Sequence, residues 1–448
     1  MSDLSMIFKA YDIRGRVGTE LTPLVTENVG KAFADWLPQE GIVAVGRDMR
    51  PDSKDLADGI IRGLRAQGRD VWDIGEVTSD MIYFAVGDNN LAGGAMVTAS
   101  HNPGEYNGIK LCREQAKPVG EETGLFDVRD AAQSEAYKTA EREGTLEAHD
   151  LDEAWVQHTL SFIDASVLKP LHIAVDAGNG MGGKIFPELE PYVPFVVEEL
   201  FFELDGTFPN HIANPLELKN LIDVQNAIKQ HGCDAGVAFD GDGDRAVLLD
   251  ENGLPLSGSV LTAILATYFM DKHPGATILH NAICGRVVPE TIKNLGGTPV
   301  RTRVGHSFIK SSMREHAAVF GGEHSGHYYF QDNFNADSGL IAAVIGLYIL
   351  SESGLKMSEL AAPFRKAYVQ IQETNFEVQD KDAVLKALVE QFQDGDADML
   401  DGLTVNYTDA WFNVRPSNTE PLMRLNAEAS NQQELDALVA RVTSVITA

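Results

Sequence analysis

The sequence predicts an α/β protein of several domains that ends in a small antiparallel α+β domain. At 448 residues the chain is too long for one hydrophobic core. Short apolar segments alternate with amphipathic ones three times before residue 367, which indicates parallel or mixed sheets covered by helices. After about residue 367 the predicted strands follow one another closely, which is typical of an antiparallel sheet.

Each α/β unit is predicted from a strand, a helix and a second strand. The ranges of these elements are 41–48, 53–68 and 70–75 in the first unit, 171–178, 221–232 and 233–240 in the second, and 276–283, 287–297 and 298–305 in the third. The last part has predicted strands at 369–378, 403–409, 411–417 and 421–429, a helix near 381–393 and a final helix. Residues 121–153 hold eleven acidic and three basic residues, and we interpret them as a solvated helical face and connector.

The composition narrows the class of protein. A net charge of −30 argues against general binding to nucleic acid or to an anionic membrane, and a phosphate ligand would need local arginines or a metal. The three cysteines are far apart and odd in number, which fits a reducing compartment and excludes a cysteine-only zinc site. No apolar run reaches the roughly 20 residues of a membrane span. The first fifteen residues lack a signal-peptide pattern, so we expect a cytoplasmic protein.

The segment TASHNPGEYNGIK, residues 98–110, follows the apolar run Ala95–Val97. Ser100 therefore lies where a predicted strand ends and a turn begins. One interpretation is a turn-forming serine that binds its own backbone. The other is a nucleophile on a loop at the end of a rigid strand, where catalytic residues concentrate.

The segment FDGDGDR, residues 239–245, predicts a metal site. Asp240, Asp242 and Asp244 alternate with glycines after an apolar strand, so three carboxylates can converge on one point. Carboxylate oxygens suit Mg²⁺, which prefers about six oxygen ligands. The alternative is an Asp/Gly-rich turn, which the mutual repulsion of three clustered carboxylates disfavours.

The segment GNGMGG, residues 178–183, matches a dinucleotide-binding pattern after a predicted strand, with Glu198 twenty residues further on. That pattern is short, and no other motif points to redox chemistry. We therefore favour a tight turn between a strand and a helix.

In GGEHSGHYYF, residues 321–330, strand alternation would place Glu323, Ser325 and His327 on one face and His324 on the other. A carboxylate beside a hydroxyl suits a pair of sugar hydroxyls, whereas two histidines three residues apart on a strand are poor zinc ligands. His306 is predicted to follow a strand at the start of a helix, where a packed or capping role is the alternative to ligand binding.

The segment NVRPSNTEP, residues 413–421, has the residues of a phosphate cradle. Arg415 supplies a guanidinium fork, and Ser417, Asn418 and Thr419 supply hydroxyl, amide and backbone donors. An ordinary polar turn is the alternative.

Together these motifs resemble those of the α-D-phosphohexomutase family, and KAYDIRG at residues 9–15 is similar to the family's opening motif. The forms GGEHSGHYYF and RPSNTEPLMRL look most like its phosphomannomutase branch. The resemblance covers nearly the whole chain. It implies three similar α/β domains with mixed sheets and a small C-terminal α+β domain around a central cleft, with boundaries at 1–150, 151–253, 254–367 and 368–448.

The resemblance also implies roles for residues. Ser100 would be a phosphoserine that passes its phosphoryl group to a hexose phosphate, and a bisphosphorylated sugar would then return its other phosphoryl group. Mg²⁺ would be held by Ser100, Asp240, Asp242 and Asp244. Catalytic neighbours would be Arg14, His101, Lys110 and Arg245, with the proton acceptor among the last three. Substrate contacts would come from Tyr11, His306, Glu323, Ser325, His327, Arg415, Ser417, Asn418 and Thr419. Ile283 stands where the family often has lysine.

The activity implied is interconversion of mannose 6-phosphate and mannose 1-phosphate, with a hexose 1,6-bisphosphate as activator and a monomer or dimer as the active form. Glucose and glucosamine phosphates are alternative substrates. A metal-dependent sugar phosphatase, which would release inorganic phosphate, is the alternative of a different class. A binding protein that has lost turnover is disfavoured, because Ser100 and the three aspartates are intact.

Overall fold

The computed structural model describes residues 3–138, 140–417 and 422–448. These residues form two compact units, Met1–Leu256 with Ser325–Ser358, and Ser257–His324 with Glu359–Ala448. The first unit contains the segments that surround Ser100 and the three aspartates, and the second contains Glu323 and Arg415.

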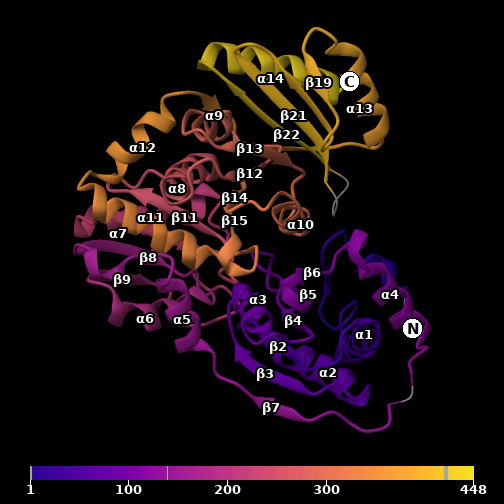
Figure 1. Ribbon diagram of the computed structural model, residues 1–448. Coiled ribbons are helices and arrows are strands. Elements are labelled where there is room, and N and C mark those ends of the chain that lie inside the picture. The colour runs from indigo at the N-terminus through magenta and orange to yellow at the C-terminus, as the bar shows by residue number, and fades with distance from the viewer. Residues whose placement is uncertain (1–2, 139, 418–421) are drawn as a thin grey trace. The chain divides into compact units, whose positions relative to one another are not determined.

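The first unit begins with a mixed sheet in the order β1-β5-β4-β2-β3-β7, with β6 paired to β5. Its strands are β1 (Ile13–Arg16), β2 (Val43–Arg47), β3 (Val71–Glu76), β4 (Gly93–Val97), β5 (Tyr106–Arg113), β6 (Lys117–Pro118) and β7 (Leu146–Ala148). Strands β4, β2, β3 and β7 run parallel, whereas β5 is antiparallel to β4 and to β1. Its helices are α1 (Pro23–Trp36), α2 (Ser53–Ala66), α3 (Ser79–Asp88) and α4 (Leu125–Ser134). Both α2 and α3 contact β2 (Figure 1), which explains why residues 43–46 of that strand are buried.

A second, smaller sheet in the same unit has the order β11-β10-β8-β9. Its strands are β8 (Leu171–Asp176), β9 (Phe195–Leu200), β10 (Ala235–Phe239) and β11 (Ala246–Asp250), and its helices are α5 (Asp152–Leu160), α6 (Gly182–Leu189) and α7 (Ile222–His231). Strands β9, β8 and β10 are parallel, and β11 returns antiparallel along β10. Helix α7 supplies Val224 and Ile228 to a core with Ala174, Ala238 and Leu249.

The antiparallel strands β15 (Tyr328–Phe330) and β16 (Ala336–Asp337) lead into α11 (Gly339–Ser353), which packs against β11 and α5. Helix α11 is buried over most of its surface, as an all-round apolar helix requires. Among the described residues no single helix passes as a membrane span by length and hydropathy, although α11 together with the following α12 (Met357–Arg365) passes by length and composition as a bent pair.

The second unit contains a parallel arrangement of β13, β12 and β14 and an antiparallel sheet near the C-terminus. The elements of the first part are α8 (Gly258–Lys272), β12 (Thr277–Asn281), α9 (Val287–Asn294), β13 (Thr298–Thr302), α10 (His306–His316) and β14 (Phe320–Gly322). The second part has the order β17-β22-β21-β20-β19, with β18 on β22, and two helices cover it. These elements are β17 (Val369–Gln370), β18 (Thr374–Glu377), α13 (Lys381–Gln391), β19 (Asp396–Asp398), β20 (Leu403–Asn406), β21 (Ala410–Pro416), β22 (Leu422–Ala429) and α14 (Gln432–Ile446).

These elements confirm the predicted α/β class, the three strand–helix–strand units and the antiparallel C-terminal part. The interpretation of 121–153 as a solvated helical face and connector was wrong in part. Helix α4 buries Leu125, Val128 and Ala132 in the first core, and β7 extends the first sheet. The many acidic residues on the exposed face of this segment concealed an apolar face of ordinary helical spacing.

Candidate active site

The site in the first unit is built where parallel strands end. Strands β2, β3 and β4 are neighbours in one sheet, and their carboxyl ends lead to Arg50, Ser79 and Ser100 respectively. Strand β10 of the second sheet leads to the segment 240–245. Loops at the carboxyl ends of strands are the usual ligand sites of α/β folds, since the sheet holds them rigidly.

Ser100 lies in a left-handed backbone conformation, with φ of +50°. Such a conformation costs a non-glycine residue energy and is concentrated at functional sites. The Ser100 amide donates to Thr98 Oγ1 at 2.9 Å, and the hydroxyl donates to Asp240 Oδ2 at 2.8 Å. The carbonyl of Ser100 approaches Gly241 so closely that a Cβ there would lie 2.5 Å from it. The aspartate segment therefore needs glycine between its first two carboxylates.

His101 presents a second polar group to the same hydroxyl. Its Nδ1 lies 3.1 Å from Ser100 Oγ and 2.9 Å from an Arg245 guanidinium nitrogen. Because Arg245 always donates, Nδ1 is an acceptor and carries no proton. Burial, with the positive charge of Arg245, holds the pKa of His101 well below its ordinary value. A neutral base thus lies next to the serine.

Lys110 holds two of the three aspartates. Strand β5 places it opposite Met96 of β4, and its Nζ lies 2.6 Å from Asp242 Oδ2 and 2.5 Å from Asp244 Oδ2. Burial alone would lower the pKa of Lys110, but the two carboxylates outweigh it and raise that pKa well above its ordinary value. Burial raises the pKa of Asp242, but Lys110 and a hydrogen bond from Ser79 hold it below its usual range.

Asp240 differs from Asp242, because burial and the charges of Asp244 and Asp242 raise its pKa well above its ordinary value. Its Oδ1 accepts the backbone N–H of Arg245 at 3.1 Å. Three carboxylates within reach of one point therefore repel one another, and a cation between them relieves that repulsion.

The three aspartates fit a divalent cation. One ligand oxygen from each lies within 4.8 Å of the others. Oδ1 of Asp242 and Oδ1 of Asp244 are buried and have no hydrogen-bond partner among the described residues, although Asp244 Oδ1 lies 3.6 Å from His327 Nε2 and 4.0 Å from Arg245 Nε. Buried carboxylate oxygens without a hydrogen bond are costly, and they are the hard ligands that Mg²⁺ takes. Asp244, His327 and Asp337 form a second such group, in which one ligand atom from each lies within 4.8 Å of the others.

Arg14 and Arg50 fix the loop that carries Ser100. Arg14 on β1 donates to the Ala99 carbonyl at 2.9 Å and pairs with Asp12 at 2.5 Å. Arg50, which sequence reasoning did not single out, donates four hydrogen bonds to the carbonyls of Ser100 (2.9 Å), Asn102 (2.6 Å), Pro103 (3.0 Å) and Tyr106 (3.0 Å). The signal in the sequence was an arginine shortly after the predicted strand 41–48 in an acidic chain, and only the structure shows that it is buried.

His327 contacts Arg245 of the aspartate segment, and Ser325 contacts His327. Arg245 Nε donates to His327 Nε2 at 3.0 Å, and Ser325 Oγ lies 3.2 Å from His327 Nδ1. Tyr11 is half-buried in the turn before β1. The prediction that Glu323, Ser325 and His327 share one face of a strand was wrong, because residues 323–326 form a turn after β14, in which Gly326 has a φ of +82°, and His327 forms an isolated bridge with Arg245.

In the second unit, Glu323 is held next to His306. Asn281, which sequence reasoning did not single out, donates to Glu323 Oε1 at 3.0 Å, and the backbone N–H of Gly305 donates to the same oxygen at 3.2 Å. His306 is the first residue of α10, as predicted. Ile283 is buried just after β12, and its N–H donates to the Asn281 side chain at 3.3 Å.

Arg415 lies on β21 within an ionic cluster. Glu373 accepts from Arg415 at 3.0 Å, from Arg424 at 3.2 Å and from Asn426 at 3.0 Å. Burial opposes ionisation of Glu373, yet Arg415 and Arg424 hold its pKa below the ordinary value. Ser417 lies 3.4 Å from an Arg424 nitrogen. Asn418 and Thr419 lie outside the described residues.

Four family profiles match the chain in order. They are phosphoglucomutase/phosphomannomutase α/β/α domains I (residues 5–138), II (153–253) and III (257–368), and the C-terminal domain (373–445). The chain belongs to the phosphoglucomutase/phosphomannomutase family. It is 40% identical to a protein of Xanthomonas campestris pv. campestris named "Phosphohexose mutases" (96% of each chain), and 37% identical to a phosphomannomutase of Salmonella montevideo (98% of each). A solved family protein from Burkholderia thailandensis superposes with a TM-score of 0.90 at 30% identity, covering 98% of this chain and 96% of that one.

The glycine-rich segment 178–183 packs against the aspartate segment. It forms the turn between β8 and α6, and its backbone supports the aspartate segment: Met181 N donates to the Gly241 carbonyl at 2.9 Å. A Cβ on Gly180 would lie 2.8 Å from that carbonyl oxygen. Close packing against the aspartate segment therefore explains these glycines without a bound dinucleotide.

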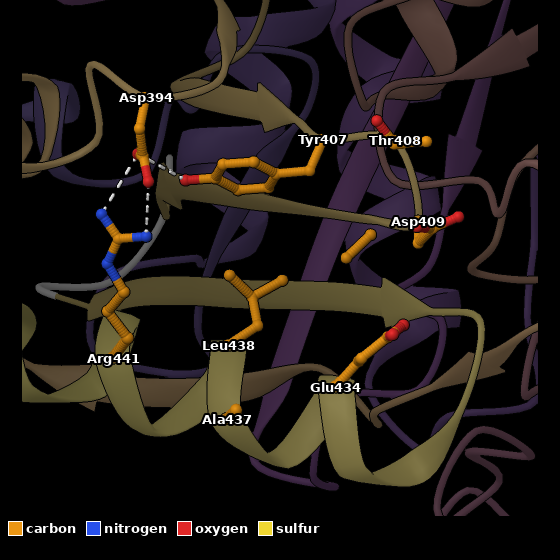
Figure 2. A pocket seen from close by; sticks show the side chains of 9 residues that line it. Asp394, Tyr407, Thr408, Asp409, Glu434, Ala437, Leu438 and Arg441 are labelled. Atoms are coloured by element: carbon orange, nitrogen blue, oxygen red, sulfur yellow. Dashed lines mark hydrogen bonds and ion pairs between the residues drawn. The ribbon is translucent and has the colours of Figure 1, made fainter.

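A separate hollow of about 500 Å³ lies in the C-terminal part of the second unit, and none of the described residues predicted for the site lines it. Figure 2 shows Arg441 forked onto Asp394, with the Tyr407 hydroxyl on the same carboxylate, beside Leu438. The distances are 2.8 Å and 3.1 Å for Arg441 and 2.9 Å for Tyr407. The charged groups at that end of the hollow therefore satisfy one another.

Proposed function

We propose that the protein is a phosphomannomutase, which interconverts mannose 6-phosphate and mannose 1-phosphate through a phosphoserine at Ser100 and a bisphosphorylated sugar. The observation that carries the proposal is the Ser100 hydroxyl, strained in its backbone, bonded to Asp240 and next to the neutral base His101. The names of the relatives from Salmonella montevideo and Vibrio cholerae, both called phosphomannomutase, support the choice of sugar.

Charge is the main obstacle to this reaction. A phosphoserine and a substrate phosphate each carry nearly two negative charges at neutral pH. Two unit charges 4 Å apart repel by about 4 kcal/mol at an effective dielectric of 20. Arg14 and Arg245 supply fixed positive charge, and Asp240, Asp242, Asp244 and Ser100 would hold Mg²⁺, which neutralises phosphoryl oxygens when bound.

In the transfer step, the P–O bond to Ser100 Oγ breaks and a bond forms between phosphorus and the attacking sugar oxygen. The proton of that sugar hydroxyl must leave, and Ser100 Oγ, which keeps the electron pair of the broken P–O bond, must take up a proton. We assign acceptance of the sugar proton to His101 rather than to Lys110 or Arg245, because both cations have a raised pKa in this site and stay protonated. The reverse transfer, from the other end of the sugar, uses the same groups.

Substrate contacts are assigned to groups in both units. Glu323, fixed by Asn281, and Ser325 would accept sugar hydroxyls, with His306, His327 and Tyr11 as further contacts. Arg415 and Ser417, with Asn418 and Thr419 of the same loop, would bind the phosphate that is not reacting. A hexose 1,6-bisphosphate would restore the phosphoserine after its loss and so act as activator.

Glucose phosphates form the second candidate substrate. The relative from Xanthomonas campestris pv. campestris carries the broader name "Phosphohexose mutases", and the same fold occurs in a Paramecium phosphoglucomutase at 15% identity (TM-score 0.80). Because mannose and glucose differ at one hydroxyl, a site that binds both ends of its intermediate can also accept both sugars.

The test combines mass and kinetics. Intact-mass analysis before and after phosphatase treatment should show one phosphate on the wild type and none on Ser100→Ala, which should also lose activity. The values of kcat/KM for mannose, glucose and glucosamine 1-phosphates, each with bisphosphate activator, then rank the substrates. Full activity in Ser100→Ala would refute the proposal. Stoichiometric release of inorganic phosphate would establish the phosphatase instead.

A further inference from the structure

Ser79 is a buried serine that sequence analysis did not single out. It begins α3, directly after the carboxyl end of β3, and is completely buried. Its hydroxyl donates to Asp242 Oδ2 at 2.5 Å, and its backbone N–H donates to the Asp242 carbonyl at 2.9 Å. The same hydroxyl accepts from Lys110 Nζ at 3.2 Å. One residue of the first sheet therefore binds one aspartate of the second sheet through both backbone and side chain.

These contacts define how the Asp242 carboxylate is oriented. Ser79 and Lys110 both engage Oδ2, while Oδ1 is buried without a hydrogen-bond partner among the described residues. Because hydrogen bonds to Oδ2 restrict rotation of this carboxylate, Oδ1 keeps its orientation. We propose that Ser79 is a positioning residue that holds Asp242 Oδ1 ready for a divalent cation. This inference rests on the metal site within the proposed function.

Ser79 is itself held in place by its neighbours. The Thr78 and Ser338 hydroxyls both donate to Asp80, the latter at 2.6 Å. Ser338 also caps α11 through the Ile341 N–H at 3.1 Å. The start of α3 is thus tied to the start of α11, and the Ser79 hydroxyl has a fixed place from which to orient Asp242.

The test is the affinity of the full-length protein for Mn²⁺, measured by electron paramagnetic resonance without sugar phosphate. Loss of a group that orients a metal ligand typically weakens affinity by about 10- to 100-fold, and we expect that range for Ser79→Ala. Saturating Mg²⁺ should restore much of kcat, with an unchanged KM for the sugar phosphate. The matched control is Ser351→Ala, which removes another buried serine hydroxyl of the same unit, one that exchanges hydrogen bonds with the Lys169 backbone.

Ser79→Cys keeps the size of the side chain and weakens its hydrogen bond, so it carries the test if the alanine variant does not fold. Its Mn²⁺ dissociation constant should lie between those of wild type and Ser79→Ala. A dissociation constant within twofold of wild type in the folded variant, or equal weakening in Ser351→Ala, overturns the inference and leaves the proposed function intact. A wild type that binds no Mn²⁺ overturns both. Weakened Mn²⁺ binding in a protein without mutase activity overturns only the proposed function.

Discussion

Replacing Arg50 with lysine keeps a positive charge and removes the guanidinium fork beneath the serine loop. Arg50 satisfies four carbonyls of residues 100–106 at 2.6–3.0 Å and lies 3.2 Å from the Asp48 carboxylate. An ammonium has only three hydrogens, all at one point, and cannot reach positions that a fork spans. If two of the four bonds are lost at about 1.5 kcal/mol each, Arg50→Lys lowers the free energy of unfolding by about 3 kcal/mol.

The same change should lower activity beyond its effect on folding. Displacement of a reacting group by about 1 Å costs on the order of 100-fold in rate, so we expect kcat to fall by about that factor with the protein fully folded. Urea denaturation gives the stability, and steady-state kinetics at a temperature well below unfolding gives kcat. The control is Arg142→Lys, because Arg142 forks onto Asp70 at the exposed surface, where such pairs contribute less than about 1 kcal/mol. If Arg50→Lys matched the control in both measurements, the loop would not depend on the fork.

Three further changes test other parts of the structure. Arg415→Ala should raise KM in both reaction directions, because it removes a charge-assisted contact worth about 1.5–3 kcal/mol. Arg415→Lys should raise KM less, because lysine keeps the charge without the fork. An unchanged KM in initial-rate assays would show that this loop does not bind the phosphate. Glu373→Gln should also raise KM, because Arg415 and Arg424 then lose the carboxylate that they share. If Glu373 instead competes with the substrate phosphate for these arginines, titration calorimetry would show that the variant binds a sugar phosphate more tightly. Burial raises the pKa of Asp80 to about 7, so between about pH 4 and 7 the folded state binds more protons than the unfolded one and the free energy of unfolding falls as pH rises, by up to about 4 kcal/mol. Asp80→Asn should flatten this slope in urea melts across that range, and an unchanged slope would assign it to another group.

The parts of the site that lie within one short segment could be predicted from the sequence. The spacing of Asp240, Asp242 and Asp244 is visible within one segment and indicates a shared site. Ser100 follows an apolar run, which indicates the strand before it. The same reasoning failed for Glu323, Ser325 and His327, because strand alternation was applied across the turn at 323–326.

Groups that act across the fold could not be predicted in this way. Arg50 and Ser79 reach the site because β2, β3 and β4 are adjacent and parallel, a fact of sheet order that one sequence does not state. Lys110 came only from family resemblance, as a candidate proton acceptor. Its two aspartate partners, and the raised pKa that they cause, are contacts between different segments that no pattern within residues 98–110 indicates.

The contacts among Ser79, Ser100, Lys110 and the aspartates join two sheets that have separate hydrophobic cores. If either sheet unfolded alone, buried charged groups of the other would lose their partners, at a cost of several kcal/mol. Partial unfolding is therefore disfavoured at the place where catalysis is proposed. The two sheets should unfold as one cooperative unit. The polar site, usually the least stable region of an enzyme, therefore couples the stabilities of the two sheets.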